Sequence, residues 1–249
     1  MLELKKQIIE FDNKPAIIGY AAVGSVYEKD GPLGGLFDYI FDDPLAGKES
    51  WEQAESELQK TALGLAIKKS QKSEKEIDLL FAGDLLNQCV GSTFGLIEYN
   101  IPFVGVYGAC STMALSLIMA SLSVEGGFAE TAAAVTSSHF CSAERQYRFP
   151  LEYAGQRPPT SQRTATASGA VIVSKDKSNI VVNRAKIGKI VDFSVADANN
   201  MGAAMAPDDV KIRPYPRHEG MVFFYTQIQY LRGFRALFKV FQSTKIRKK

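Results

Sequence analysis

The sequence predicts an α/β fold built on a mixed, mostly parallel sheet. Short, continuous apolar runs of strand length alternate along the chain with segments whose apolar residues recur at helical spacing. Polar and glycine-rich clusters follow several of those runs. The expected order is β-α-β-α-β-α-β-β, which implies parallel strands with right-handed crossovers, finished by an antiparallel strand. A chain of 249 residues can bury a sizeable core without disulfides or metals.

The first strand and the first long helix are predicted near the N-terminus. The apolar run from Pro15 to Val23 is typical of a buried strand, and the glycine-rich stretch from Asp30 to Asp38 should be irregular. Ser50 and Gln53 form an S-x-x-Q capping box, which marks the start of a helix. Apolar residues at helical spacing give that helix one buried stripe: Trp51, Ala54, Leu58, Ala62 and Leu65.

Two more β-α units follow. Ile77–Ala82 is a continuous apolar run, as a strand covered by helices on both faces requires. A helix is expected over Leu86 to Glu98, and a strand over Phe103 to Tyr107. Residues 108–112 then turn the chain into Met113–Val124, which is apolar on nearly all sides and should be a buried helix.

The remaining strands are predicted over Thr131–Thr136, Ser168–Ser174 and Asn179–Ile190, with a turn at Lys175–Ser178 between the last two. Ligands of parallel sheets bind at the carboxyl ends of the strands. Three polar loops are expected there, over residues 83–87, 108–112 and 137–139.

Charge divides the chain unevenly. Residues 1–209 hold 19 Lys and Arg against 26 Asp and Glu, whereas residues 210–249 hold 10 against 1. The last forty residues therefore form a basic aromatic tail, which we expect to be irregular or partly helical. An amphipathic membrane-surface segment is the alternative for this tail.

Several kinds of site are disfavoured by composition. The three cysteines show no C-x-x-C spacing, so neither a disulfide framework nor a zinc site is expected, and a reducing compartment fits best. No glycine-rich dinucleotide fingerprint and no nucleic-acid-binding signature occur. We therefore predict no cofactor, no resident metal and no nucleic acid partner. The N-terminus lacks signal-peptide features, and no apolar run is long enough to span a membrane.

Cys110 is the leading candidate for chemistry. It lies where a strand gives way to a buried helix, and a helix N-terminus favours the thiolate and offers N–H groups to an anion. The alternative is a small buried side chain, which is what most free cysteines are.

Two further loops carry candidate residues with equally ordinary alternatives. His139 follows a strand end and is either a base or ligand donor, or a satisfied loop histidine. Asp84 and Asn87 could orient a polar ligand or cap the next helix.

The long loop over residues 144–160 is aromatic and basic, and its prolines prevent a helix. Arg148 and Arg157 suit a carboxylate ligand, and Tyr153 offers a flat surface to an aromatic ring. The alternative is a solvated loop that contacts another subunit.

Seven ordered stretches resemble the stage V sporulation protein AD family: DGPLG (30–34), LFAGDLLNQ (80–88), IPFVGVYGACST (101–112), TSSH (136–139), AERQYRFP (143–150), EYAGQRPPT (152–160) and NMGAAMAP (200–207). The resemblance implies a thiolase-like fold, of which residues 1–207 would be the N-terminal half, with the second half largely missing. Residues 208–249 diverge from the family, as a truncated or frameshifted reading frame would. Phe140-Cys141 and Ala198-Asn199 also depart from the family pattern.

The resemblance also implies a function and a site. Cys110 would stand at the nucleophile position of thiolases, with the remaining ligand-binding residues being Asp84, Asn87, Ser111, Thr112, Ser138, His139, Arg148, Tyr153 and Arg157. The implied function is binding of dipicolinic acid, alone or as its calcium complex, for uptake into the developing spore, without catalysis. The alternative is an acyl-transferring condensing enzyme that uses Cys110.

Implied partners are other stage V sporulation membrane proteins and, in complete family members, a second copy of the chain. The implied location is the cytoplasmic side of the spore inner membrane, as a peripheral protein.

Overall fold

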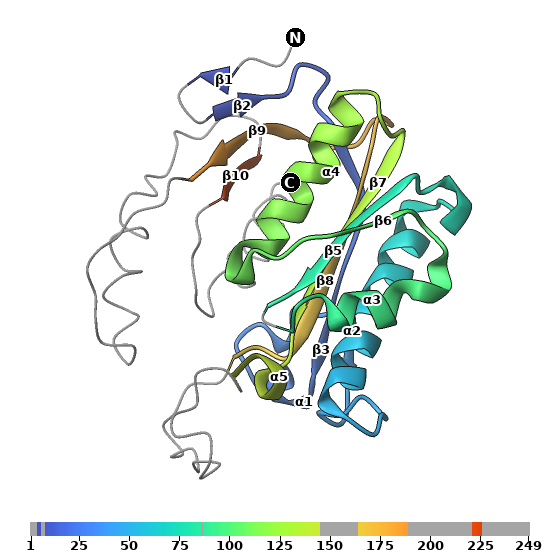
Figure 1. Ribbon diagram of the computed structural model, residues 1–249, viewed down its shortest axis with the longest axis vertical. Helices are drawn as coiled ribbons and strands as arrows, with labels where there is room; N and C mark the ends of the chain where they lie inside the picture. Colours follow the sequence, from blue (N-terminus) through green and yellow to red (C-terminus); the bar gives the residue numbers. More distant parts are fainter. Residues whose placement is uncertain (1–3, 6–7, 86, 145–163, 189–220, 226–249) are drawn as a thin grey trace, which may run out of the picture.

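The computed structural model describes residues 4–5, 8–85, 87–144, 164–188 and 221–225. Its main feature is a six-stranded sheet in the order β4-β3-β8-β7-β5-β6 (Figure 1). Its strands are β3 (Ala16–Ser25), β4 (Tyr39–Phe41), β5 (Leu79–Asp84), β6 (Phe103–Gly105), β7 (Thr131–Ser138) and β8 (Ala167–Ser174). Of these six, β8 alone runs antiparallel to its neighbours. The predicted α/β class with a mixed, mostly parallel sheet is confirmed.

Helices cover both faces of this sheet. α2 (Trp51–Ser70) and α3 (Val90–Leu96) lie on one face, and α4 (Thr112–Glu125) lies on the other (Figure 1). Successive side chains of a strand point to opposite faces of the sheet. In β5, Leu80 packs into the core beneath α2 and Phe81 packs into the core beneath α4. Both faces are therefore apolar, which explains why the strands read as continuous apolar runs.

Short helical segments connect the main elements: α1 (Val26–Lys29), η1 (Gly34–Leu36), η2 (Glu74–Glu76), η3 (Ile97–Tyr99), η4 (Ala109–Ser111) and α5 (Phe140–Glu144). α1 follows β3 and α5 follows β7, and the two lie at the same end of the sheet (Figure 1). That end carries the carboxyl ends of the parallel strands.

α2 begins where its predicted cap placed it. The Ser50 hydroxyl accepts a hydrogen bond from the Gln53 N–H at 3.3 Å. The Gln53 side chain accepts in turn a hydrogen bond from the Glu49 N–H at 3.1 Å. In a standard capping box it would accept from the N–H of the N-cap residue, Ser50, which is the next residue along the chain. These bonds fix the first turn of the helix and the direction of the chain that enters it.

α3 is shorter than the helix predicted over Leu86 to Glu98. Gln88 and Cys89 have φ angles of 55° and 65°, so the backbone becomes helical only after them. α3 also packs very closely on α2. A Cβ added at Gly95 would lie only 2.5 Å from the Ser56 carbonyl oxygen. Glycine is required for that approach.

A second, four-stranded sheet, which was not predicted, has the order β1-β2-β9-β10. Its strands are β1 (Leu4–Lys5), β2 (Ile8–Glu10), β9 (Val182–Ile187) and β10 (Met221–Tyr225). Ile9, Phe11 and Val182 are buried in the same core as α4. The second sheet thus extends the core on the α4 face.

The end of the described chain differs from the prediction in two ways. β8 lies between β3 and β7 in the main sheet, whereas β9 pairs with β2 and β10 in the second sheet. The tail expected to be irregular or partly helical contributes the strand β10, parallel to β9. Strand pairing depends on contacts between distant parts of the chain, which local periodicity does not encode.

Candidate functional site

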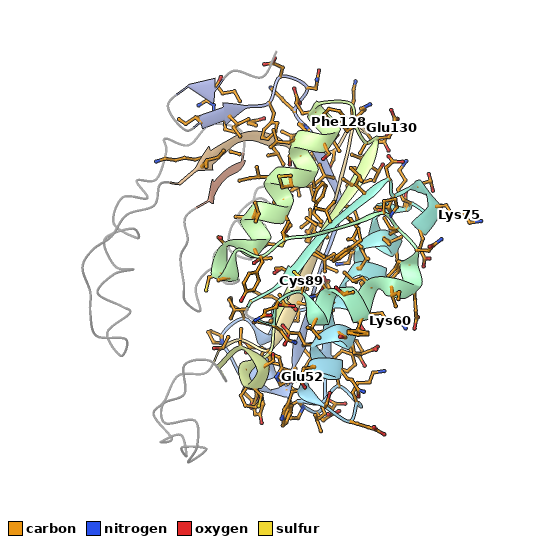
Figure 2. All side chains as sticks on the ribbon, in the orientation of Figure 1. Glu52, Lys60, Lys75, Cys89, Phe128 and Glu130 are labelled. Atoms are coloured by element: carbon orange, nitrogen blue, oxygen red, sulfur yellow. The ribbon has the colours of Figure 1, made fainter. Side chains whose placement is uncertain are left out.

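The carboxyl ends of β5 and β7 lie side by side at one end of the main sheet. The last residue of β5, Asp84, is the register partner of Ser137 in β7. Figure 2 shows Cys89, in the loop after β5, and Glu52, at the start of α2, toward this end, while Phe128 lies at the opposite end. Two of the three polar loops predicted to converge therefore do so.

The third loop, after β6, packs directly on the end of β5. The Val106 N–H donates to the Ala82 carbonyl at 2.9 Å, and the Cys89 thiol donates to the Val106 carbonyl at 3.4 Å. A Cβ on Gly83 would lie 2.0 Å from the Val106 carbonyl oxygen and 2.7 Å from the methyl carbon of Thr112. Glycine at position 83 lets the turn before α4 cross the end of β5.

Cys110 lies in the predicted strand-to-helix turn, partly buried, one residue before the N-cap of α4. The preceding residue, Ala109, has a φ angle of 47°, a left-handed conformation that alanine rarely adopts. The Ser111 hydroxyl donates to the Gly108 carbonyl at 2.6 Å, and the Thr112 hydroxyl donates to the Ala109 carbonyl at 2.7 Å. Ser111 and Thr112, predicted to bind ligand, thus donate their hydroxyl hydrogens to the turn that presents Cys110.

His139 is fully buried, and both ring nitrogens have backbone partners. Nε2 lies 2.9 Å from the Pro44 carbonyl oxygen, and Nδ1 accepts from the Cys141 N–H at 3.2 Å. Because a carbonyl oxygen can only accept, Nε2 carries the proton and Nδ1 the lone pair. Burial lowers the pKa of His139, while the hydrogen bond to Pro44 opposes that shift. The geometry is that of a satisfied, neutral histidine.

Aromatic rings pack around this imidazole. Its centroid lies 5.1 Å from those of Trp51 and Phe140, and Phe140 meets Tyr27 edge-on at 5.2 Å. The ring of His139 is therefore held by packing as well as by hydrogen bonds.

Asp84 is fully buried at the end of β5, close to the start of α3. Burial raises the pKa of Asp84, and the N–H groups of Cys89, Asn87 and Gly91 partly offset that shift. Neither carboxylate oxygen of Asp84 accepts a well-formed hydrogen bond from the described residues, and Nδ2 of Asn87 donates none to them. Asp84 therefore lies near the N–H groups at the start of α3 without capping that helix through a well-formed hydrogen bond.

The other predicted ligand-binding residues divide into two groups. Ser138 donates its hydroxyl hydrogen to the Ala165 carbonyl, which ties β7 to the segment before β8. Arg148, Tyr153 and Arg157 lie outside the described residues, so their roles stay predictions.

The predicted residues share one end of the sheet but not one face. Leu80 and Ala82 of β5 belong to the core beneath α2, so Asp84, two residues further, continues that face. Cys110 instead precedes α4, the helix on the opposite face. Asp84 and His139 therefore lie at the face of the main sheet that α2 covers, whereas Cys110 lies at the start of α4, the helix that covers the opposite face.

Two buried polar residues of α2 were missed in the sequence. Glu55 and Gln59 are 1% and 0% exposed and contact the ends of β5 and β7. They are four residues apart, next to the predicted stripe residues Ala54 and Leu58. A buried stripe widened by one residue would have included both.

Across the described ranges, no group of three or more His, Cys, Asp or Glu residues is arranged to hold a metal ion. Of the helices in the described part of the chain, none is long and apolar enough to cross a membrane.

Comparison with known proteins gives concordant matches. The family model for stage V sporulation protein AD matches residues 5–214, slightly beyond the boundary predicted at residue 207. Stage V sporulation protein AD of Bacillus subtilis (strain 168) is 43% identical over 202 residues, which cover 81% of this chain. The match spans 60% of the length of that relative.

Solved structures of ketosynthases are more distantly similar. 3-Oxoacyl-[acyl-carrier-protein] synthase III from Aquifex aeolicus VF5 is 15% identical with a TM-score of 0.43, covering 66% of this chain and 55% of its own. OleA H285N from Xanthomonas campestris is 14% identical with a TM-score of 0.45, covering 66% and 57%. The match of the family model over most of the sequence, together with the identity to the Bacillus subtilis relative, shows that the chain belongs to the stage V sporulation protein AD family.

Proposed function

We propose that the protein binds dipicolinic acid, alone or as its calcium complex, and serves its uptake into the developing spore without catalysing a reaction. Family membership supports the link to sporulation. The aromatic and basic loop over residues 144–160 supports an aromatic dicarboxylate as the ligand, since arginine binds carboxylates in a bidentate manner.

One observation favours a binding protein over an enzyme. His139, the histidine predicted near Cys110, uses Nε2 to donate to Pro44 and Nδ1 to accept from Cys141. A general base needs an unoccupied lone pair within reach of the proton that it removes. Because the lone pair of Nδ1 is already engaged, His139 is poorly suited to activate a thiol.

The binding function is tested by calorimetric titration of the full chain with dipicolinate, with benzoate and phthalate as controls. We expect dipicolinate to bind selectively over both. Equal affinity for the three carboxylates, or no heat from any of them, would contradict the proposal.

Substitutions distinguish binding from catalysis. Arg148→Ala or Arg157→Ala should each weaken dipicolinate binding by about 1.5–3 kcal/mol, roughly 10- to 150-fold, because each removes a charge-assisted hydrogen bond. Cys110→Ala should weaken binding less, since a binder needs cations and shape there more than a thiolate. A larger loss from Cys110→Ala than from either arginine variant would count against this assignment.

The second candidate function is acyl transfer through Cys110. The left-handed Ala109 and the start of α4 hold the partly buried Cys110 at a tight turn, a setting that suits a nucleophile. Incubation with acyl-CoA followed by mass spectrometry would reveal an acyl adduct on Cys110, absent from Cys110→Ala. Without an adduct, the enzymatic alternative falls.

We also propose that other stage V sporulation membrane proteins are its partners and place it peripherally at the spore inner membrane. Affinity capture from sporulating cells tests this. Recovery of those membrane proteins supports the proposal, and a membrane-free fraction that holds all of the protein contradicts it.

A further inference from the structure

A buried polar network joins α2 to the carboxyl end of the sheet. We propose that Glu55 and Gln59 are positioning residues of the candidate site. The two side chains hold the ends of β5 and β7 and the start of α5 in one arrangement. Glu55 does so as a neutral carboxylic acid. This inference rests on the proposed function of that site, which it deepens.

Gln59 contacts three elements with one amide nitrogen. Its Nε2 lies 2.7 Å from the Ser137 hydroxyl of β7, 3.0 Å from the Ser92 hydroxyl of α3 and 3.3 Å from the Gly83 carbonyl of β5. Since Gly83 offers an acceptor only, the amide nitrogen must face it. Gln59 therefore fixes the residue beside Asp84 relative to the end of β7.

Glu55 completes the connection to α5. Its Oε1 accepts from the Ser137 hydroxyl at 2.9 Å, and its Oε2 lies 2.7 Å from the Ser142 hydroxyl. Ser137 and Ser142 stand on either side of His139 in the sequence. Glu55 thus holds both ends of the segment that carries His139.

The geometry accommodates a proton on Glu55. The Ser142 oxygen also lies 3.3 Å from the His139 carbonyl oxygen. When Glu55 is protonated, its Oε2–H can donate to Ser142, and Ser142 can donate to that carbonyl. When Glu55 is ionised, Ser142 must turn its hydrogen toward Glu55, and the contact with His139 is lost. The neutral acid therefore makes one more hydrogen bond with the same atoms.

The surroundings also favour the neutral form. The charged groups that face Glu55 are both acidic: Asp84 from β5 and Glu52 from its own helix. β7, α3 and α5 present the serines Ser137, Ser92 and Ser142 to this network. Burial and the neighbouring Asp84 raise the pKa of Glu55 to about 7, against the opposing effect of the two serine hydrogen bonds.

Ionisation of Glu55 would then affect ligand binding. It would place a negative charge close to Asp84, at the end of the sheet that carries the predicted ligand-binding residues Asp84 and His139. Aromatic carboxyl groups titrate well below this range, so the charge of the ligand stays constant. If only the form with neutral Glu55 binds, the Kd for dipicolinate should rise about tenfold between about pH 6 and about pH 8.

The matched variants are Glu55→Gln and Glu57→Gln of the same helix. A glutamine at position 55 can accept from Ser137 and donate to Ser142, so it imitates the neutral acid. Glu55→Gln should bind dipicolinate at about pH 8 as tightly as the unmodified chain does at about pH 6, within about twofold. Glu57, which pairs with Lys48 at 3.1 Å, serves as the control, and its variant should keep the pH dependence. A Glu55→Gln protein that keeps the full pH dependence would overturn the inference.

A second measurement is independent of the ligand. Carbon-13 NMR of the glutamate carboxyl groups in the full chain should show one group that titrates near pH 7 and disappears in Glu55→Gln. If Glu55 instead titrates near its ordinary value of 4.5, the inference is wrong even where dipicolinate binds. If dipicolinate does not bind at any pH, the proposed function fails, while the NMR titration still decides whether Glu55 is neutral.

Discussion

Gly83 lies where the turn before Cys110 crosses the end of β5, and it has no room for a larger side chain. In Gly83→Ala the new Cβ would stand 2.0 Å from the Val106 carbonyl oxygen. The turn would have to move, so we expect a loss of about 1–3 kcal/mol in the free energy of unfolding, measured by denaturant titration.

Gly35→Ala is the matched control, because a Cβ there meets nothing within 4 Å. The same chemical change should alter the free energy of unfolding by less than about 0.5 kcal/mol. Equal losses in the free energy of unfolding from the two substitutions would contradict the close approach of the Val106 carbonyl to Gly83.

The protonation of His139 gives a second test at this scale. Its folded-state pKa lies below the ordinary 6.5, so the unfolded chain binds more protons as the pH falls below 6.5. The contribution of His139 to stability is therefore complete above that pH and decreases as the pH falls. Nitrogen-15 NMR of the imidazole should show the Nε2–H form and a depressed pKa. The chain has only two histidines, so His218→Gln leaves one signal to follow.

Either the Nδ1–H form or a pKa at or above 6.5 would contradict the observed hydrogen bonds of His139 to Pro44 and Cys141. It would also reopen the role of a base for His139.

These residues show how far single positions can be interpreted from sequence. The turn at Cys110 was predictable, because an apolar strand, a glycine and an apolar helix follow one another locally. The state of His139 was not, since its acceptor, Pro44, is 95 residues away in the sequence. Glu55 also escaped notice, because a glutamate on a helix is ordinarily solvated and only its tertiary contacts show otherwise.

Strand β6 is an edge of the main sheet, with β5 as its partner in the described chain. Phe103 and Val104 within it are 40% and 39% exposed. An apolar edge strand is a template for pairing with another chain. The family resemblance implies a second copy of the chain in complete family members, and we expect β6 to be the strand through which two copies associate. Val104→Lys should weaken that association, measured by sedimentation velocity over a range of concentrations.

Tyr39→Lys tests the opposite edge, since Tyr39 is 48% exposed on β4. That variant should associate like the unmodified chain. If Tyr39→Lys dissociates the protein and Val104→Lys does not, the copies pair through β4 instead.

Elements were easier to predict than their arrangement. The capped helix α2 and the strands β3, β5, β7 and β8 follow local patterns and lie within a few residues of their predicted spans. The position of β8 between β3 and β7, and the departure of β9 to a second sheet, depend on pairing with distant strands. Periodicity identifies a strand but does not name its partner.

For the molecule as a whole, the second sheet raises the question of whether it unfolds separately. Glu125 at the end of α4 accepts hydrogen bonds from the Asp12 and Asn13 N–H groups at 3.0 and 3.1 Å. The chain after β2 is thereby fastened to the end of α4. Phe11, at 3% exposure, belongs to the same core as Leu117 of α4 and Val173 of β8. A shared core of this kind couples the two sheets in one cooperative unit.

Phe11→Ala tests that coupling. The substitution removes a buried ring from the shared core, so we expect a loss of about 3–5 kcal/mol in the free energy of unfolding of the whole protein. Denaturant unfolding followed by Trp51 fluorescence reports on the main sheet, because α2 packs there. Phe128→Ala removes the same ring at a position that is 83% exposed and should shift the transition by less than about 0.5 kcal/mol. If the Trp51 transition stays unchanged in Phe11→Ala, the second sheet unfolds on its own and the core is not shared.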